Sequence, residues 1–137
     1  IIKAIFSEQA IKNVEYLGKV PYEKVQGIIK NADVCVFPSY AEALPVSWLE
    51  AMAMEKVVVA SNIGWASEII THGVDGFLEH PKEHTKYANS ILNILTGEVN
   101  SSELEKNARR NVKEKFSNNI VAEQHVEFYK KVINGIQ

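Results

Sequence analysis

Cysteine is nearly absent from this chain, and so are the features that would tie it to a membrane or a nucleic acid. The one cysteine, Cys35, lies in the apolar run Val34–Phe37, so the chain can form no internal disulfide or thiolate metal site, and a buried, reduced thiol is predicted. A net charge of −2 gives no electrostatic case for nucleic acid or an anionic membrane. The longest apolar runs are strand-sized, too short to span a bilayer.

Two further absences concern the start and the loops of the chain. The first residue is Ile1 rather than Met, and no basic and apolar leader opens the sequence. Neither common glycine-rich phosphate fingerprint occurs among the seven glycines. What is present, 137 residues of which 46% are hydrophobic, has the size and composition of a single globular domain with a real core.

Short apolar strands alternate with helical stretches, an order typical of a parallel sheet with crossover helices. We therefore predict an α/β fold, a Rossmann-like parallel sheet between two helical layers, followed by a helical C-terminal end. Strands are expected at 14–17 (closed by Gly18), 34–37, 57–60 and 77–78. Residues 1–10 are expected to be the end of a helix. Further helices are expected at 22–30, 45–54, 66–70, 83–95, 102–115 and 118–133, with Ser117 as an N-cap.

Two glutamates bracket the start of the helix predicted at 45–54. Glu50 falls on an apolar stripe that runs from Val46 to Met54, and a partly buried carboxylate is costly unless something hydrogen-bonds it. Hydroxyl groups of a ligand could do so. Glu42 precedes Pro45, which suits a first helical position, so the pair brackets a helix N-terminus that can collect anions and hydroxyls. The alternative is structural: a solvated Glu42, and a Glu50 that meets a core lysine or a backbone group.

The surrounding residues form an ordered set. An apolar strand leads to Pro38-Ser39, then to Glu-Ala-Leu-Pro at 42–45 and Leu-Glu-Ala-Met-Ala at 49–53, with seven residues between the two glutamates. This segment resembles the donor-binding segment of group 1 glycosyltransferases, which are retaining, two-domain GT-B enzymes that use nucleotide-sugars. The resemblance extends through 14–20 upstream and 72–78 downstream, and covers about residues 14–116 in order.

The resemblance implies a role for each glutamate. Glu50 matches the glutamate that bridges the two ribose hydroxyls of the nucleotide. Glu42 matches the one beside the sugar and its reacting carbon, where a carboxylate would orient the donor and stabilise positive charge in the transition state. We do not assign Glu42 as a covalent nucleophile. The backbone N–H groups that bind the sugar and phosphates match those of Ala43, Leu44 and Val46. The region that faces the base matches Gly18, Lys19 and Val20.

The resemblance also implies what these residues do not supply. In the family, an earlier loop gives an arginine and a lysine to the donor diphosphate, and a separate N-terminal domain binds the acceptor. The two arginines here, Arg109 and Arg110, lie in a late predicted helix. We therefore expect 1–137 to be one partial nucleotide-sugar-binding domain, N-terminally truncated and inactive alone. Asp33 and Asp75 form no Asp-x-Asp motif, so metal-independent chemistry without a cofactor is expected.

The predicted function is the C-terminal portion of a retaining hexosyltransferase in polysaccharide biosynthesis. It would move a sugar from a nucleotide-sugar donor to a glycan or lipid-linked acceptor, which the N-terminal domain would bind. A cytoplasmic location is expected, with peripheral association at the inner face of the membrane as an alternative, and no nucleic-acid partner. Two other functions stay open: a catalytically inactive GT-B-like interaction module and, less favoured, a sugar-nucleotide epimerase.

The chain departs from the family pattern at a few positions. Ala43 stands where glycine is most common, though a small residue keeps the backbone approachable. Glu55 and Val57 replace the usual glycine and proline, so the turn after the helix must close without them, which affects stability more than chemistry. Trp65 replaces a common glycine beside the expected pocket, and we favour a structural role at the edge of the core over stacking on a ligand.

Overall fold

The computed structural model describes residues 6–135, and three parallel strands form its central sheet. The strands are β1 (Val34–Phe37), β2 (Val57–Ser61) and β3 (Phe77–Glu79), in the spatial order β1-β2-β3. Their register pairs Val34 with Val57 and Val59 with Phe77. Helix α2 (Val46–Ala53) connects β1 to β2, and α3 (Ala66–Ile69) lies between β2 and β3. The predicted α/β sheet with crossover helices is confirmed.

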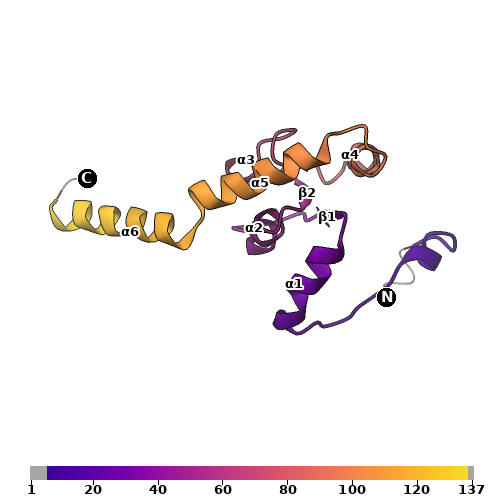
Figure 1. Ribbon diagram of the computed structural model, residues 1–137, viewed down its shortest axis with the longest axis horizontal. Coiled ribbons are helices and arrows are strands. Elements are labelled where there is room, and N and C mark those ends of the chain that lie inside the picture. The colour runs from indigo at the N-terminus through magenta and orange to yellow at the C-terminus, as the bar shows by residue number, and fades with distance from the viewer. Residues whose placement is uncertain (1–5, 136–137) are drawn as a thin grey trace.

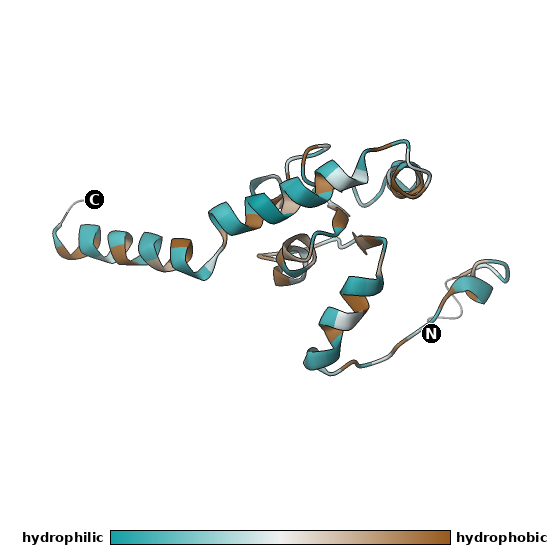
Figure 2. Ribbon diagram, viewed as in Figure 1, coloured by the Kyte–Doolittle hydropathy of each residue, from teal (hydrophilic) through white to brown (hydrophobic). Residues whose placement is uncertain are grey.

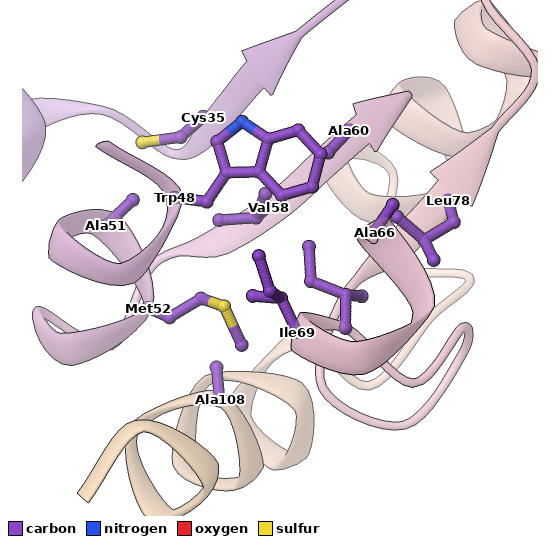
Figure 3. Close-up of a cluster of buried hydrophobic side chains, with 11 residues drawn as sticks. Cys35, Trp48, Ala51, Met52, Val58, Ala60, Ala66, Ile69, Leu78 and Ala108 are labelled. Atoms are coloured by element: carbon purple, nitrogen blue, oxygen red, sulfur yellow. The ribbon is translucent and has the colours of Figure 1, made fainter. Parts of the chain in front are cut away.

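Helices cover both faces of the sheet, because alternate residues of the buried central strand β2 point to opposite sides. On one face α2, α3 and α5 (Ser101–Lys115) pack in a core that includes Cys35, Trp48, Met52, Val58, Ala60, Ile69 and Ala108 (Figure 3). The other face packs against α4 (His84–Leu95) and the start of α5 through Val57, Val59, Tyr87, Ile94 and Leu104. The sheet is thus the middle of three layers, as predicted.

The N-terminal part of the described chain packs less tightly. It contains a short 3-10 helix, η2 (Ile11–Asn13), and α1 (Tyr22–Asn31), joined by extended residues 14–20. The strand predicted at 14–17 is therefore wrong: Tyr16 is 71% exposed, and no strand among residues 6–135 pairs with this segment. A strand requires a hydrogen-bonded neighbour, which sequence pattern alone does not provide. Gly18 has a positive φ of +66, and the chain bends at Lys19.

The C-terminal helix α6 (Asn118–Ile133) extends away from the three-layer body (Figure 1). None of its residues is buried, and apolar residues recur along it among hydrophilic ones (Figure 2). Its predicted bounds are confirmed, with Ser117 at the N-cap, although the Ser117 side chain makes no capping hydrogen bond. Within residues 6–135, no helix combines the length and the apolar character needed to cross a membrane.

Helix α2 buries a different face from the one that its spacing indicated. Trp48 and Met52 are buried, whereas Val46, on the predicted stripe, is 57% exposed. Six of its eight residues are apolar, so periodicity could not select one face. Glu50 is half-buried all the same, as predicted.

Residues 1–10 were predicted to be the end of a helix. Residues 1–5 lie outside the described residues, and residues 6–10 form a bend and a turn rather than a helix.

Candidate donor-binding site

The candidate site begins where β1 ends. Residues 38–45 leave the carboxyl end of β1 and lead into α2, the place where ligands bind in parallel α/β sheets. Glu42 lies half-buried in this loop. The loop after β2 comes close to it: a methyl group added to Gly64 would lie 3.4 Å from the Glu42 carbonyl oxygen, and Gly64 has a φ of +52. Two loops from neighbouring strands therefore meet at Glu42.

A tyrosine on α4 ties the ends of β1 and β2 together beneath these loops. The Tyr87 hydroxyl donates to the Phe37 carbonyl oxygen at 3.0 Å and lies 3.1 Å from Ser61 Oγ. Burial raises the pKa of Tyr87, which keeps the phenol protonated and able to donate. Sequence reasoning missed this residue, because Tyr87 and Phe37 are 50 positions apart and nothing in either local pattern marks the contact.

The start of α2 offers unused hydrogen-bond donors. Pro45 was predicted to be the first residue of the helix, but it is the N-cap, one position earlier. No side chain caps the helix. Among residues 6–135, no loop or capping hydrogen bond uses the backbone N–H of Ala43, Leu44 or Val46. These N–H groups lie at the positive end of the helix dipole, where phosphate and hydroxyl oxygens are stabilised. The three residues predicted to bind through their backbones thus have N–H groups that a ligand can use.

Glu50 faces α1 rather than the core. Its Oε1 accepts a 2.7 Å hydrogen bond from the Tyr22 hydroxyl, so the predicted structural partners, a core lysine or a backbone group, are wrong. The groove between the two helices, about 170 Å³, is lined by Tyr22, Val25, Gln26, Ile29, Glu50, Ala53 and Met54. The loop of Gly18, Lys19 and Val20 leads directly into α1, with Val20 half-buried. The role of this loop in facing the base stays a prediction.

Ala43 and Leu44 line a second and separate hollow. This cavity of about 440 Å³ is lined by Ala43, Leu44, Trp65, Glu68, Ile69 and Phe116, and Glu50 does not reach it. Trp65 is 63% exposed and lines this cavity beside Ile69, and the structural role that we favoured for it at the edge of the core stays a prediction. The candidate site consists of two hollows, one beside Glu50 and one beside the loop that carries Glu42.

Cys35 and the acidic residues do not suggest a metal centre. Cys35 is buried as predicted, and burial raises the pKa of its thiol, which keeps it protonated and a poor metal ligand. Among residues 6–135, no three histidine, cysteine or carboxylate side chains gather as metal ligands would.

Comparisons with known proteins bear on the family and the fold. The family described as "Glycosyl transferases group 1" matches residues 2–115. A relative in Campylobacter jejuni, N,N'-diacetylbacillosaminyl-diphospho-undecaprenol alpha-1,3-N-acetylgalactosaminyltransferase, is 32% identical over 90% of this chain and 32% of its own length. The chain thus spans about a third of the length of this relative.

Two solved structures share the fold. Sucrose-phosphate synthase from Thermosynechococcus elongatus is 28% identical, with a TM-score of 0.85 over 98% of this chain and 34% of that protein. Anabaena HepE, solved in complex with UDP-glucose, is 26% identical, with a TM-score of 0.80 over 95% of this chain and 36% of that one. These likenesses favour a glycosyltransferase over an interaction module or an epimerase. The chain belongs to the group 1 glycosyltransferase family, and its parallel sheet with crossover helices is of the GT-B type.

Proposed function

We propose that this chain binds the nucleotide-sugar donor of a retaining glycosyltransferase that transfers the sugar to a glycan or lipid-linked acceptor. The observation that carries the proposal is Glu50, a half-buried carboxylate that has one protein donor and faces an open groove. Such a group can accept further hydrogen bonds from a diol. The UDP-glucose in Anabaena HepE and the lipid-linked substrate in the name of the Campylobacter jejuni relative support the two substrate classes.

Each part of the site has one task in this proposal. Glu50 accepts hydrogen bonds from the two ribose hydroxyls, and Gly18, Lys19 and Val20 face the base at the start of α1. The donor's phosphates and sugar take hydrogen bonds from the unused N–H groups of Ala43, Leu44 and Val46. The donor would then run from the groove beside α1 toward the carboxyl end of β1.

Glu42 is the residue that we propose acts on the reacting sugar. As the C1–oxygen bond to the diphosphate breaks, positive charge develops at the anomeric carbon and ring oxygen, and a nearby carboxylate stabilises it. The close approach of the Gly64 loop to the Glu42 carbonyl oxygen supports a defined backbone position for this residue. Glu42 orients the sugar and acts through its charge, without forming a covalent intermediate, and the chain's own residues need no metal ion for this step.

The remaining parts of the reaction lie beyond these residues. We propose that the acceptor and an arginine–lysine pair for the diphosphate come from the rest of the full-length gene product, in keeping with the third of the relative's length that this chain spans. Residues 1–137 alone would bind donor weakly and transfer nothing. We propose a cytoplasmic setting, with the inner face of the membrane as the place where a lipid-linked acceptor would be met.

Calorimetric titration of ribonucleoside diphosphates tests the nucleotide assignment. Glu50→Ala in the full-length gene product is expected to weaken binding by ~1–3 kcal/mol, because two ribose hydroxyls lose a charged acceptor. Glu123→Ala, which removes an exposed carboxylate from α6, is the matched control and is expected to bind as the wild type does. Equal affinities of the wild type and Glu50→Ala would contradict the assignment.

A further inference from the structure

The contact between Tyr22 and Glu50 joins two helices across an open groove. Tyr22 is the first residue of α1, its side chain is 68% exposed, and its hydroxyl reaches Glu50 Oε1 at 2.7 Å. Among residues 6–135, no other side-chain hydrogen bond links α1 to α2. Burial of Tyr22 does not explain the contact, because most of the ring lies in solvent. The hydrogen bond between the Tyr22 hydroxyl and the Glu50 carboxylate, rather than packing of the ring, is therefore what defines the contact.

The chemistry of the contact leaves most of the carboxylate open. An ionised carboxylate offers about four lone-pair directions, and the Tyr22 hydroxyl occupies one of them on Oε1. The hydrogen bond to Glu50 and, after it, the charge of Glu50 raise the pKa of Tyr22, so the phenol keeps its proton and remains a donor. The hydrogen bond also fixes a side chain that would otherwise sample several rotamers, and a ligand that meets a fixed acceptor loses less conformational freedom on binding.

We propose that Tyr22 is a positioning residue for nucleotide binding: it holds the Glu50 carboxylate in the orientation that accepts the ribose hydroxyls. This role rests on the proposed function, and it makes the first turn of α1 a part of the donor site. Tyr22 acts through Glu50 and does not itself contact the reacting sugar. Its effect therefore depends on two things, the presence of the Glu50 carboxylate and the presence of the ribose diol.

The test uses the full-length gene product and the ribonucleoside diphosphate that binds it most tightly, together with the 2′,3′-dideoxy analogue of that nucleotide. Tyr22→Phe removes only the hydroxyl and is expected to weaken the ribonucleotide about three- to tenfold, the usual worth of one hydrogen bond. It is expected to leave the dideoxy affinity unchanged, and to have no further effect when Glu50 is already alanine. Tyr129→Phe, which alters an exposed tyrosine on α6, is the matched control.

The outcomes separate the two proposals. Wild-type affinity of Tyr22→Phe for the ribonucleotide, or an equal loss for the ribonucleotide and its dideoxy analogue, overturns the positioning role alone. Failure of every ribonucleoside diphosphate to bind the wild type overturns the proposed function as well. The contact can also be tested without a ligand, in the 137-residue chain. Glu50→Gln should lower the pKa of Tyr22 toward its ordinary value of 10.0, and NMR signals of the tyrosine ring measure that pKa. An unchanged Tyr22 titration overturns the contact.

Discussion

Two carboxylates in this molecule, Asp75 and Glu50, differ in how many of their oxygens accept hydrogen bonds from the protein. Asp75 is 5% exposed, and both of its oxygens are taken: Oδ1 by the Thr71 N–H at 2.7 Å and Oδ2 by Asn111 Nδ2 at 2.8 Å. Glu50 is half-buried, faces a groove and has one donor, the Tyr22 hydroxyl. Asp75 is thus satisfied by the protein itself, whereas Glu50 keeps acceptor positions for something else.

The number of hydrogen bonds that a carboxylate receives from the protein separates structural from ligand-binding acids in this chain. A closed carboxylate such as Asp75 stabilises its surroundings, and its loss should be felt in folding. The loss of an open carboxylate such as Glu50, which keeps free acceptor positions, should instead weaken ligand binding. Glu42 is the more open case: among residues 6–135, no hydrogen bond or ion pair to its side chain occurs.

The largest effect is expected from the most open acid. Glu42→Gln keeps the shape and hydrogen-bonding capacity of the side chain but removes its charge. If this charge stabilises the transition state, kcat of the full-length gene product should fall on the order of 10²-fold or more, while affinity for free nucleoside diphosphate stays nearly constant. Steady-state kinetics and calorimetry measure the two quantities.

The control for this comparison is Glu98→Gln, which changes an exposed glutamate in the turn after α4 and should leave kcat unaltered. A Glu42→Gln variant with wild-type kcat would make Glu42 a solvated loop acid. A loss of nucleotide affinity as large as the loss of kcat would instead place Glu42 at the nucleotide.

The closed acid should show its effect in folding. Asn111 Nδ2 donates to both Asp75 Oδ2 and the Ile69 carbonyl oxygen, each at 2.8 Å, inside the protein. Asn111→Ala leaves both acceptors buried without that donor and should lower the free energy of unfolding by about 2 kcal/mol. Asn107→Ala, on the same helix, loses two exposed hydrogen bonds, one donated to Val74 and one accepted from Arg110, and should cost less because water can replace both. Urea unfolding compares them, and equal costs would contradict the distinction.

Asp75 should also give the chain a pH dependence of stability. Burial raises the pKa of its carboxyl above the ordinary 3.8, although the hydrogen bonds from Thr71 and Asn111 act in the opposite direction. Because the pKa is higher in the folded state, the folded chain binds this proton more tightly than the unfolded chain does. The contribution of Asp75 is therefore full below about pH 3.8 and is lost as pH rises through the folded-state pKa.

Urea unfolding at a series of pH values measures this contribution. Relative to Asp75→Asn, which cannot titrate, the wild type should lose stability as pH rises across that window. The effect should be smaller than that of Asn111→Ala, because both hydrogen bonds to Asp75 persist throughout. If the difference in free energy of unfolding between the wild type and Asp75→Asn does not change with pH, the folded and unfolded states bind the Asp75 proton equally.

Much of the fold could be predicted from local pattern. The strand at 34–37 and the helix at 118–133 have the predicted bounds, because apolar runs of strand length and clear helix breaks specify them locally. The strand predicted at 14–17 is wrong for a non-local reason, since strand formation depends on a neighbour. The buried face of α2 could not be predicted, because the helix carries its own apolar residues on all sides.

The site was predicted less fully than the fold. The motif located Glu42, Glu50 and the N–H groups at the start of α2, since these lie close together in sequence. It did not indicate Tyr22, which meets Glu50 across 28 positions, or Tyr87 on α4. These contacts depend on how helices pack against each other and the sheet, and no local spacing encodes them. The exposure of Trp65 likewise follows from tertiary packing.

The smallest effect concerns a fourth carboxylate, Glu55, in the turn that ends α2. Among residues 6–135, Glu55 is the one non-glycine residue with a positive φ, +58, and it stands where the resemblance to the family implies glycine. A left-handed conformation costs a residue with a Cβ roughly 1–2 kcal/mol. Its contact with Arg109, 3.6 Å between the nearest nitrogen and oxygen, is half-exposed and worth little by comparison. Backbone conformation, rather than charge, should therefore dominate at this position.

Two substitutions at position 55 separate backbone from charge. Glu55→Ala removes the carboxylate but keeps the Cβ, whereas Glu55→Gly removes both. We expect Glu55→Gly to exceed Glu55→Ala in free energy of unfolding by about 1 kcal/mol, because relief of the left-handed strain outweighs the greater freedom of glycine in the unfolded chain. Urea unfolding measures the difference. Equal stability of the two variants, both below the wild type, would mean that the Arg109 contact matters more than the backbone.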